Sequence, residues 1–251
     1  MNEPVPAHSE LDANLAVKSY FQDPDWMFKT GIGGTITAAS IVLSIMDPVH
    51  FMLFPISLAL AGVSTGYVLR TIRQRLSEPE KPLPKWDDWG DLFMSGITWI
   101  AVQFGISVLA ATVITIVIMV CYATVVKSSA FVTPMLEAGL FCILATVFWT
   151  HFISTFLMVN FAKEEKLGAG FAVIPVLRRI RKNSPLFLLT WALATAIQVF
   201  SVLVSAITIL GIFIIPSVYF ASQLVAASLL AQAWRSVPDQ MAESAPAAAI
   251  K

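Results

Sequence analysis

The stretch ITWIAVQFGISVLAATVITIVIMVCYATVV, residues 97–126, decides the fold class, because it runs for thirty residues without Asp, Glu, Lys or Arg. As a helix it would be about 45 Å long at a rise of 1.5 Å per residue. The hydrocarbon core of a bilayer is roughly 30 Å thick, so we expect a membrane helix here that tilts or protrudes. Similar apolar blocks predict five further spans, at 30–46, 48–67 with a polar extension over 70–76, 133–161, 184–209 and 216–234.

The Asp, Pro and Gly residues in and between these blocks predict where the helices begin, bend and end. Asp47-Pro48 ends the first span and starts the second, because Asp caps a helix and Pro fits its first turn. Pro55 lies within the second span and is expected to bend it. Gly211 is expected to close the fifth span. Pro55 is then the one proline inside a span, whereas transporters commonly have helices broken in mid-membrane.

The composition excludes several classes of protein. Hydrophobic residues make up 57% of the chain and charged residues 13%, against roughly 25% charged residues in soluble domains. The formal net charge of zero argues against nucleic-acid binding. Cys121 and Cys142 lie in apolar blocks without metal-ligand spacing, so we expect no disulfide framework, metal or cofactor. Residues 1–28 carry five acidic residues and lack an apolar run, which predicts no cleaved signal peptide.

The basic residues predict the orientation of the spans. Fifteen of the sixteen Lys and Arg residues lie in the two chain tails or in the segments 70–85 and 163–182, and Lys127 is the exception. With six spans, these four regions share one side of the membrane. The positive-inside rule assigns that side to the cytoplasm, together with both termini.

The spans group into three hairpins, each preceded by a polar or amphipathic stretch. These stretches are a capping box at Ser9–Asp12, the segment 86–91 and the segment 171–182. In the last, residues 171, 174, 177 and 180 share one face, which predicts a helix lying in the headgroup plane. Its basic residues are expected to bind anionic lipid as surface charges, and they are Arg178, Arg179, Arg181 and Lys182.

The domain plan is accordingly a cytoplasmic tail over residues 1–22 with a short amphipathic helix, a six-helix membrane domain over 23–235, and a disordered tail over 236–251. The fold class is all-α, a polytopic membrane helix bundle with interfacial amphipathic helices.

Three stretches, FQDPDW at 21–26, GYVLR at 66–70 and PLPKWDDWGDLF at 82–93, resemble in order and spacing a prokaryotic membrane family catalogued as domain of unknown function 4013. The resemblance covers most of residues 20–235. It departs from the family at Lys85, where members often carry an acidic residue. The family has no established activity, so the resemblance implies an architecture and a prokaryotic cytoplasmic membrane. The motif residues are Asp23, Pro24, Trp26, Gly66, Tyr67, Arg70, Pro82, Pro84, Trp86, Asp87, Asp88, Trp89 and Gly90.

Two motifs have a structural and a functional interpretation. Asp87, Asp88 and Asp91 suggest a metal site, but acidic residues in the first turn of a helix more commonly complement its dipole and cap its free N–H groups. Gly62 and Gly66 form a GxxxG pair, which we expect to pack against another helix of the same chain rather than a second copy.

Polar residues inside the apolar blocks are the remaining candidates for function. His151 is costly inside a membrane. We expect a neutral imidazole bonded to a glutamine of a neighbouring helix, and the alternative is a proton-linked or ligand-binding role. The intramembrane polar candidates are Gln103, Glu137, His151, Asn160, Gln198 and Gln223.

The sequence is compatible with two functions. The chain has no nucleophile elbow, HExxH or phosphate loop, so we expect no enzyme. The first interpretation is a non-catalytic scaffold, assembly or lipid-environment factor. The alternative is a small-solute or ion permease that acts as an oligomer. The expected partners are the lipid bilayer and, beyond it, other membrane proteins or a second copy. Convergence of the intramembrane polar residues on one cavity would favour the permease.

Overall fold

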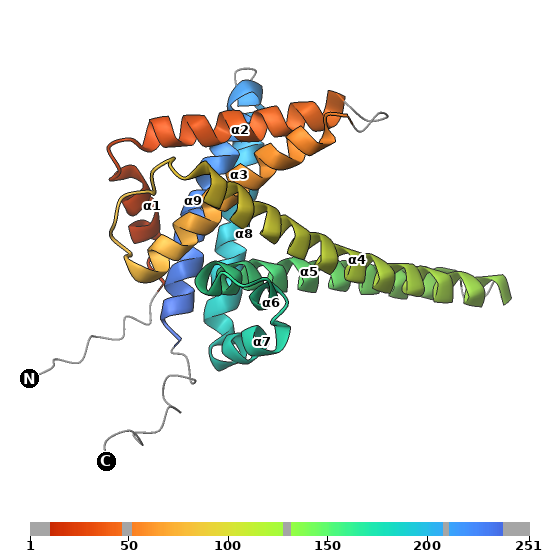
Figure 1. The fold of residues 1–251 in the computed structure, drawn as a ribbon. Helices are drawn as coiled ribbons and strands as arrows, with labels where there is room; N and C mark the ends of the chain where they lie inside the picture. The colour runs from red at the N-terminus through yellow and green to blue at the C-terminus, as the bar shows by residue number, and fades with distance from the viewer. Residues whose placement is uncertain (1–10, 47–51, 128–131, 208–210, 238–251) are drawn as a thin grey trace, which may run out of the picture.

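The structure is a computed structural model that describes residues 11–46, 52–127, 132–207 and 211–237. All regular secondary structure in these ranges is helical, which confirms the predicted all-α class (Figure 1). The helices are α1 (Ala13–Phe21), α2 (Trp26–Met46), α3 (Phe54–Ser77), α4 (Trp89–Lys127), α5 (Val132–Glu164), α6 (Leu167–Gly170), α7 (Val173–Lys182), α8 (Ser184–Ile207) and α9 (Gly211–Arg235).

Five helices are long and apolar enough to cross a membrane, namely α2, α4, α5, α8 and α9, and they make this a multi-pass membrane protein. Within the described residues α3 is the exception among the six expected spans. Only sixteen residues, 54–69, precede Arg70, and Arg73 and Arg75 follow in the next two turns. A spanning helix needs about 20 predominantly apolar residues. The sixth span and the pairing into three membrane hairpins therefore stay predictions.

Several predicted helix boundaries need correction. Pro55 lies in the first turn of α3, where its missing N–H costs nothing, so the predicted bend is wrong. Gly211 begins α9, which leaves Pro216 inside that helix rather than at its start. Asp47-Pro48 falls outside the described residues.

The start of α1 is also displaced from the expected capping box. Asp12 caps α1 by accepting a hydrogen bond from the Leu15 N–H at 2.8 Å. Ser9 and Glu10 of the expected box fall outside the described residues.

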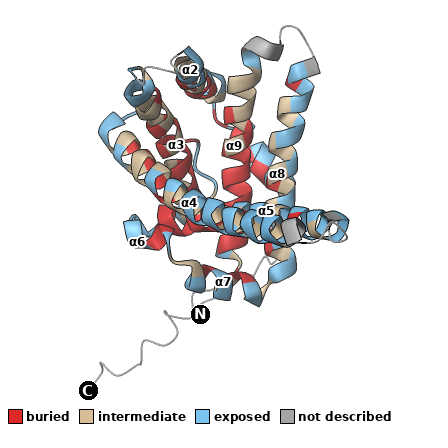
Figure 2. Cartoon of the chain, turned by 90° about the vertical axis from the view of Figure 1, so that its right-hand side faces the viewer, coloured by how far each residue is buried: buried red, intermediate tan, exposed pale blue. Residues whose placement is uncertain are grey.

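Helix α9 is the centre of the packing. It contacts α1, α2, α3, α5 and α8, and more than half of its apolar window is buried. None of the corresponding window of α4 is buried, and Figure 2 shows this contrast between the two helices. Figure 1 shows α4 and α5 running together away from the rest of the chain. Their exposed apolar surface is suited to contact with lipid, as the membrane assignment requires.

Glycines allow α3 and α4 to cross at backbone contact. A Cβ atom added at Gly96 would lie 1.7 Å from the carbonyl oxygen of Gly62, and one added at Gly66 would lie 1.8 Å from that of Leu92. Both distances are far below any van der Waals contact. The GxxxG pair thus packs against a helix of the same chain, which confirms that prediction.

Candidate functional site

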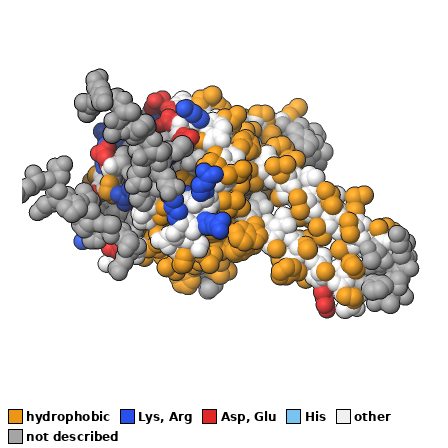
Figure 3. Space-filling view, turned by 90° about the horizontal axis from the view of Figure 1, so that it is seen from below, with side chains coloured by type: hydrophobic (Ala, Val, Ile, Leu, Met, Phe, Trp, Pro, Cys, Tyr) orange, Lys and Arg blue, Asp and Glu red, His pale blue; other side chains and the backbone are white. Residues whose placement is uncertain are grey.

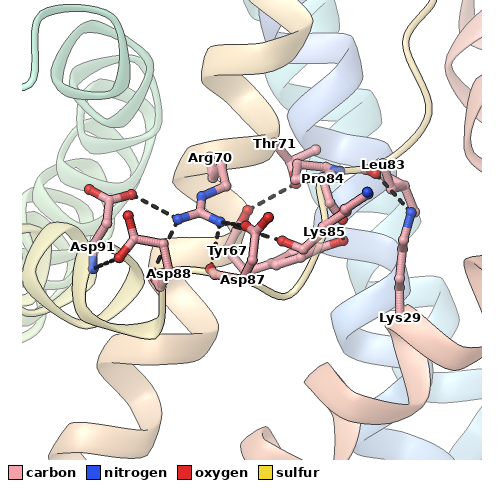
Figure 4. Close-up of polar contacts among 10 residues, drawn as sticks. All are labelled: Lys29, Tyr67, Arg70, Thr71, Leu83, Pro84, Lys85, Asp87, Asp88 and Asp91. Atoms are coloured by element: carbon pink, nitrogen blue, oxygen red, sulfur yellow. Dashed lines mark hydrogen bonds and ion pairs between the residues drawn. The ribbon is translucent and has the colours of Figure 1, made fainter.

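The motif loop before α4 is held by side chains from α2 and α3. The Tyr67 hydroxyl donates to the Pro84 carbonyl at 2.7 Å, and the Lys29 ammonium donates to the Leu83 carbonyl at 2.9 Å (Figure 4). The Trp86 ring stacks on Tyr67 with centroids 4.0 Å apart, and its indole N–H donates to the Lys29 carbonyl at 3.0 Å. Tyr67 of the second motif stretch and Lys29, three residues after the first, therefore fix the path of the third.

A buried ion pair joins the first motif stretch to this loop. Lys29 Nζ lies 2.7 Å from Asp23 Oδ2, and the Asp23 side chain is fully buried. The other Asp23 oxygen accepts from the Asp25 N–H at 2.7 Å. Each charge has a close partner, and removing either one would leave the other buried without compensation.

Arg70 gathers the acidic cluster of the motif. Its guanidinium lies 2.7 Å from Asp87 Oδ1 and 3.0 Å from Asp91 Oδ2, and it donates to the carbonyls of Asp87 and Asp88 (Figure 4). Asp88 Oδ1 accepts from the Asp91 N–H at 3.3 Å at the start of α4. Of the three acidic residues, Asp88 therefore caps α4 as the capping interpretation expects, whereas Asp87 and Asp91 pair with Arg70. Among the described residues, no three His, Cys, Asp or Glu side chains are grouped to hold a metal ion.

Arg75 is a structural residue of this region that the sequence analysis did not single out. Its buried guanidinium donates to the carbonyls of Pro79, Lys81 and Ser19, which ties α3 to the motif loop and to α1. Burial lowers the pKa of Arg75, and the nearby Asp23 carboxylate opposes that shift. Its sequence signal is an arginine in the polar extension that follows the apolar run, and from the sequence alone this residue predicts only the topology.

A cavity of about 560 Å³ lies between α3, α4, α5, α8 and α9. Four of the six intramembrane polar candidates line it, from four different helices: Gln103, His151, Gln198 and Gln223. None of the three glutamine side chains hydrogen-bonds another described residue. Apolar side chains such as Phe104 complete the walls, and the lining residues within the described ranges include no Asp, Glu, Lys or Arg.

The cavity has further polar groups that the sequence analysis missed. They are Thr65, Ser107, Ser154, Thr155 and Tyr219. Three of them lie one helical turn from a predicted candidate, as i,i+4 pairs: Gln103 with Ser107, His151 with Thr155, and Tyr219 with Gln223. Residues at this spacing share a helix face, so the pairing was detectable in the sequence.

The side chain of His151 differs from the expectation. Its ring contacts Trp191 with centroids 5.7 Å apart, and its backbone carbonyl accepts from Ser154 and Thr155. The predicted hydrogen bond to a glutamine of a neighbouring helix does not form among the residues described. The imidazole instead lines the cavity.

Glu137 and Asn160 lie away from this cavity. Glu137 is exposed near the start of α5. Asn160 is buried and donates to the Ala169 carbonyl at 3.0 Å, so it anchors α6 against α5. The six candidates therefore divide into four at the cavity, one structural residue and one exposed carboxylate.

Helix α7 exposes most of the apolar face that the sequence predicts, because Phe171, Ile174 and Leu177 are exposed and Ile180 alone of the four is buried. Val176 and Ile180 are buried, whereas Ile174 is 71% exposed. Arg179 donates to the carbonyls of Trp234 and Val237, and its guanidinium carbon lies 4.4 Å from the Trp234 ring centroid. The interpretation of Arg179 as a free surface charge is therefore wrong, because this side chain binds the C-terminal end of α9.

Comparison with known proteins adds a family but no activity. A family model described as "Protein of unknown function (DUF4013)" matches residues 49–215, which is 167 of 251 residues. No curated protein and no solved structure matches the chain. The matched range contains the second and third motif stretches and all of the cavity lining except the part on α9. With about two thirds of its length matched, including the motif loop and the residues Tyr67 and Arg70 that bind it, the chain belongs to the DUF4013 family.

Proposed function

We propose that this protein is a non-catalytic permease subunit that binds small uncharged solutes in the cavity between its helices. The observation that carries this proposal is that Gln103, His151, Gln198 and Gln223 line one cavity. Amides and imidazoles whose role is only to stabilise helix packing form hydrogen bonds with neighbouring helices. Here the three amides have no such partner among the described residues, and convergent polar groups in an otherwise apolar pocket are typical of ligand sites.

The lining also defines the class of solute. Amides and hydroxyls both donate and accept hydrogen bonds, so the cavity suits a molecule that carries both kinds of group. An ion would lose its hydration without gaining a charged partner, because none of the described residues that line the cavity is acidic or basic. Uncharged polar solutes are therefore favoured over ions.

The proposed setting is the cytoplasmic membrane of a prokaryote, with both termini in the cytoplasm. The distribution of basic residues supports this orientation. The proposal includes an oligomer, since six helices suffice for half of a transport path and the exposed apolar surface of α4 offers a face for a second copy.

The first test asks whether water reaches the cavity. In a chain with Cys121→Ala and Cys142→Ala, a single cysteine replaces Gln103, and iodoacetamide labelling is measured in membrane vesicles. Alkylation needs a thiolate and hence water, so this position should react much faster than a control cysteine at Leu109, which is exposed on the apolar surface of the same helix. Equally slow reaction at both positions would remove the basis of the proposal.

The second test measures transport. Proteoliposomes containing the full chain are mixed with glycerol or urea, and the rate of swelling is followed by light scattering. We expect faster entry than in empty liposomes, no increase for sodium chloride, and a slower rate for Gln103→Leu with Gln223→Leu. Unchanged solute entry in the presence of folded protein would rule out the permease.

A scaffold or assembly factor is the second candidate, and one observation favours it. In the part of the chain that the structure describes, no motif residue lines the cavity, and Tyr67 and Arg70 instead bind the motif residues Pro84 and Asp87. A labelled cavity without transport, combined with co-purification of a stoichiometric membrane partner, would support this candidate instead.

A further inference from the structure

Helix α7 has two differently used flanks. Val176 and Ile180 face the protein and are buried. With 100° between successive residues of a helix, Leu177, Arg181, Ile174 and Arg178 follow one another around the opposite arc. All four of these side chains are exposed, Ile174 at 71% and Leu177 at 38%. We call these four residues the headgroup flank.

Arg179 does not belong to this flank. It is the basic residue that binds the Trp234 and Val237 carbonyls and the Trp234 ring, between the buried and exposed sides of α7. The helix therefore uses one arginine to attach itself to α9 and presents the neighbouring arginines outward. Arg178 and Arg181 form no hydrogen bond or ion pair with another described residue.

We propose that the headgroup flank binds the phosphate groups of anionic membrane lipids, with Ile174 and Leu177 in contact with the upper acyl chains. Apolar and basic side chains alternate around this arc, and Figure 3 shows basic side chains set among hydrophobic ones on this face of the molecule. A membrane interface satisfies both kinds of side chain at once. Free phosphate would satisfy the arginines but leave Ile174 in water. The proposal is independent of whether the cavity transports a solute.

The test uses the purified full chain in a neutral detergent. Equal amounts of phosphatidylglycerol and phosphatidylcholine with identical acyl chains are added, and the lipids retained are counted by native mass spectrometry. The wild type should retain phosphatidylglycerol preferentially. Arg178→Gln with Arg181→Gln should reduce that preference by up to about 30-fold at low ionic strength, and added salt should reduce it in the wild type.

Four controls make the result specific. Arg178→Lys with Arg181→Lys should keep the preference, because a diffuse contact depends on charge and not on guanidinium geometry. Arg179→Gln should keep the preference but lower the thermal midpoint, because it detaches α7 from α9. Glycerol phosphate should not displace the lipid at equal concentration, whereas Ile174→Ser with Leu177→Ser should weaken lipid retention.

Three results would overturn the proposal. One is an unchanged lipid preference in the folded double glutamine variant. Another is loss of the preference in the double lysine variant, which would indicate a shaped anion pocket. The third is equal competition by glycerol phosphate, which would indicate a site for a soluble anion.

Discussion

The ion pair between Lys29 and Asp23 gives the sharpest test of what stabilises the region around the motif loop. Lys29→Met removes the ammonium but leaves the Asp23 carboxylate fully buried, with only the Asp25 N–H as a partner. Breaking a buried pair in this way costs about 3–5 kcal/mol. The Leu83 carbonyl also loses its donor, which adds about 1 kcal/mol. We therefore expect Lys29→Met to lower the free energy of unfolding by roughly 4–6 kcal/mol.

The double variant Asp23→Asn with Lys29→Met separates the charge from the packing. No charge then remains buried, while the asparagine oxygen still accepts from the Asp25 N–H. We expect this variant to be more stable than Lys29→Met alone by about 2 kcal/mol, because replacing a whole buried pair by neutral groups costs far less than breaking it. The control is Lys81→Met, which removes an exposed pair with Glu78 and should cost less than about 1 kcal/mol.

The measurement is a reversible denaturant titration of the purified protein in mixed micelles, followed by tryptophan fluorescence and analysed as a double-mutant cycle. A cost below about 1 kcal/mol for Lys29→Met would show that water reaches the pair. A double variant no more stable than Lys29→Met would show that the lost contacts are apolar rather than ionic. Either result refutes the assignment of Asp23 and Lys29 as a buried electrostatic link.

Two further predictions concern helix packing and topology. Gly96→Ala should lower the free energy of unfolding by about 1–3 kcal/mol or more, because its Cβ would meet the backbone of α3. The control Gly31→Ala should change the stability little, since nothing lies within 4 Å of its Cβ position. Both variants are measured by thermal unfolding in detergent. A single cysteine at Lys81 should react with an impermeant maleimide only after the membrane is permeabilised, and one at Ser129 should react from outside; labelling of position 81 in sealed cells would overturn the topology.

The sequence was sufficient to predict the helical class, the long apolar helices and the chain-internal packing of Gly62 and Gly66. It was misleading at prolines. The local pattern places Pro55 inside a span and Pro216 at the start of one, yet α3 begins at Phe54 and α9 begins at Gly211. A proline fits the first turn of a helix or distorts its interior, and only the position of the neighbouring turn distinguishes the two.

The different contacts of the basic residues in α7 could also not be predicted from the sequence. Arg178, Arg179 and Arg181 look equivalent in a run of charges, but only Arg179 reaches the end of α9. Such a contact depends on a helix 55 residues away in the chain. Hydrophobic periodicity predicted the amphipathic helix and its outward apolar residues, but it did not single out Val176, which is buried against the protein. A helix at a membrane interface has apolar surroundings on more than one side.

The candidate cavity and the motif region depend on each other through α9, most of which lies beyond the family match. Residues 216–235 follow the end of that match, yet Tyr219 and Gln223 line the cavity, and Phe220 lies 5.8 Å from the ring of Tyr67 in the motif region. A Cβ at Gly33 would overlap the Phe220 ring, so α2 must approach α9 at a glycine. On α9, Phe220 thus lies between the buried contacts of the motif region and the two polar residues that line the cavity, Tyr219 and Gln223. A substitution at Phe220 should alter both the stability of the motif region and iodoacetamide labelling at the cavity. A substitution confined to the lipid-exposed surface of α4 should alter neither.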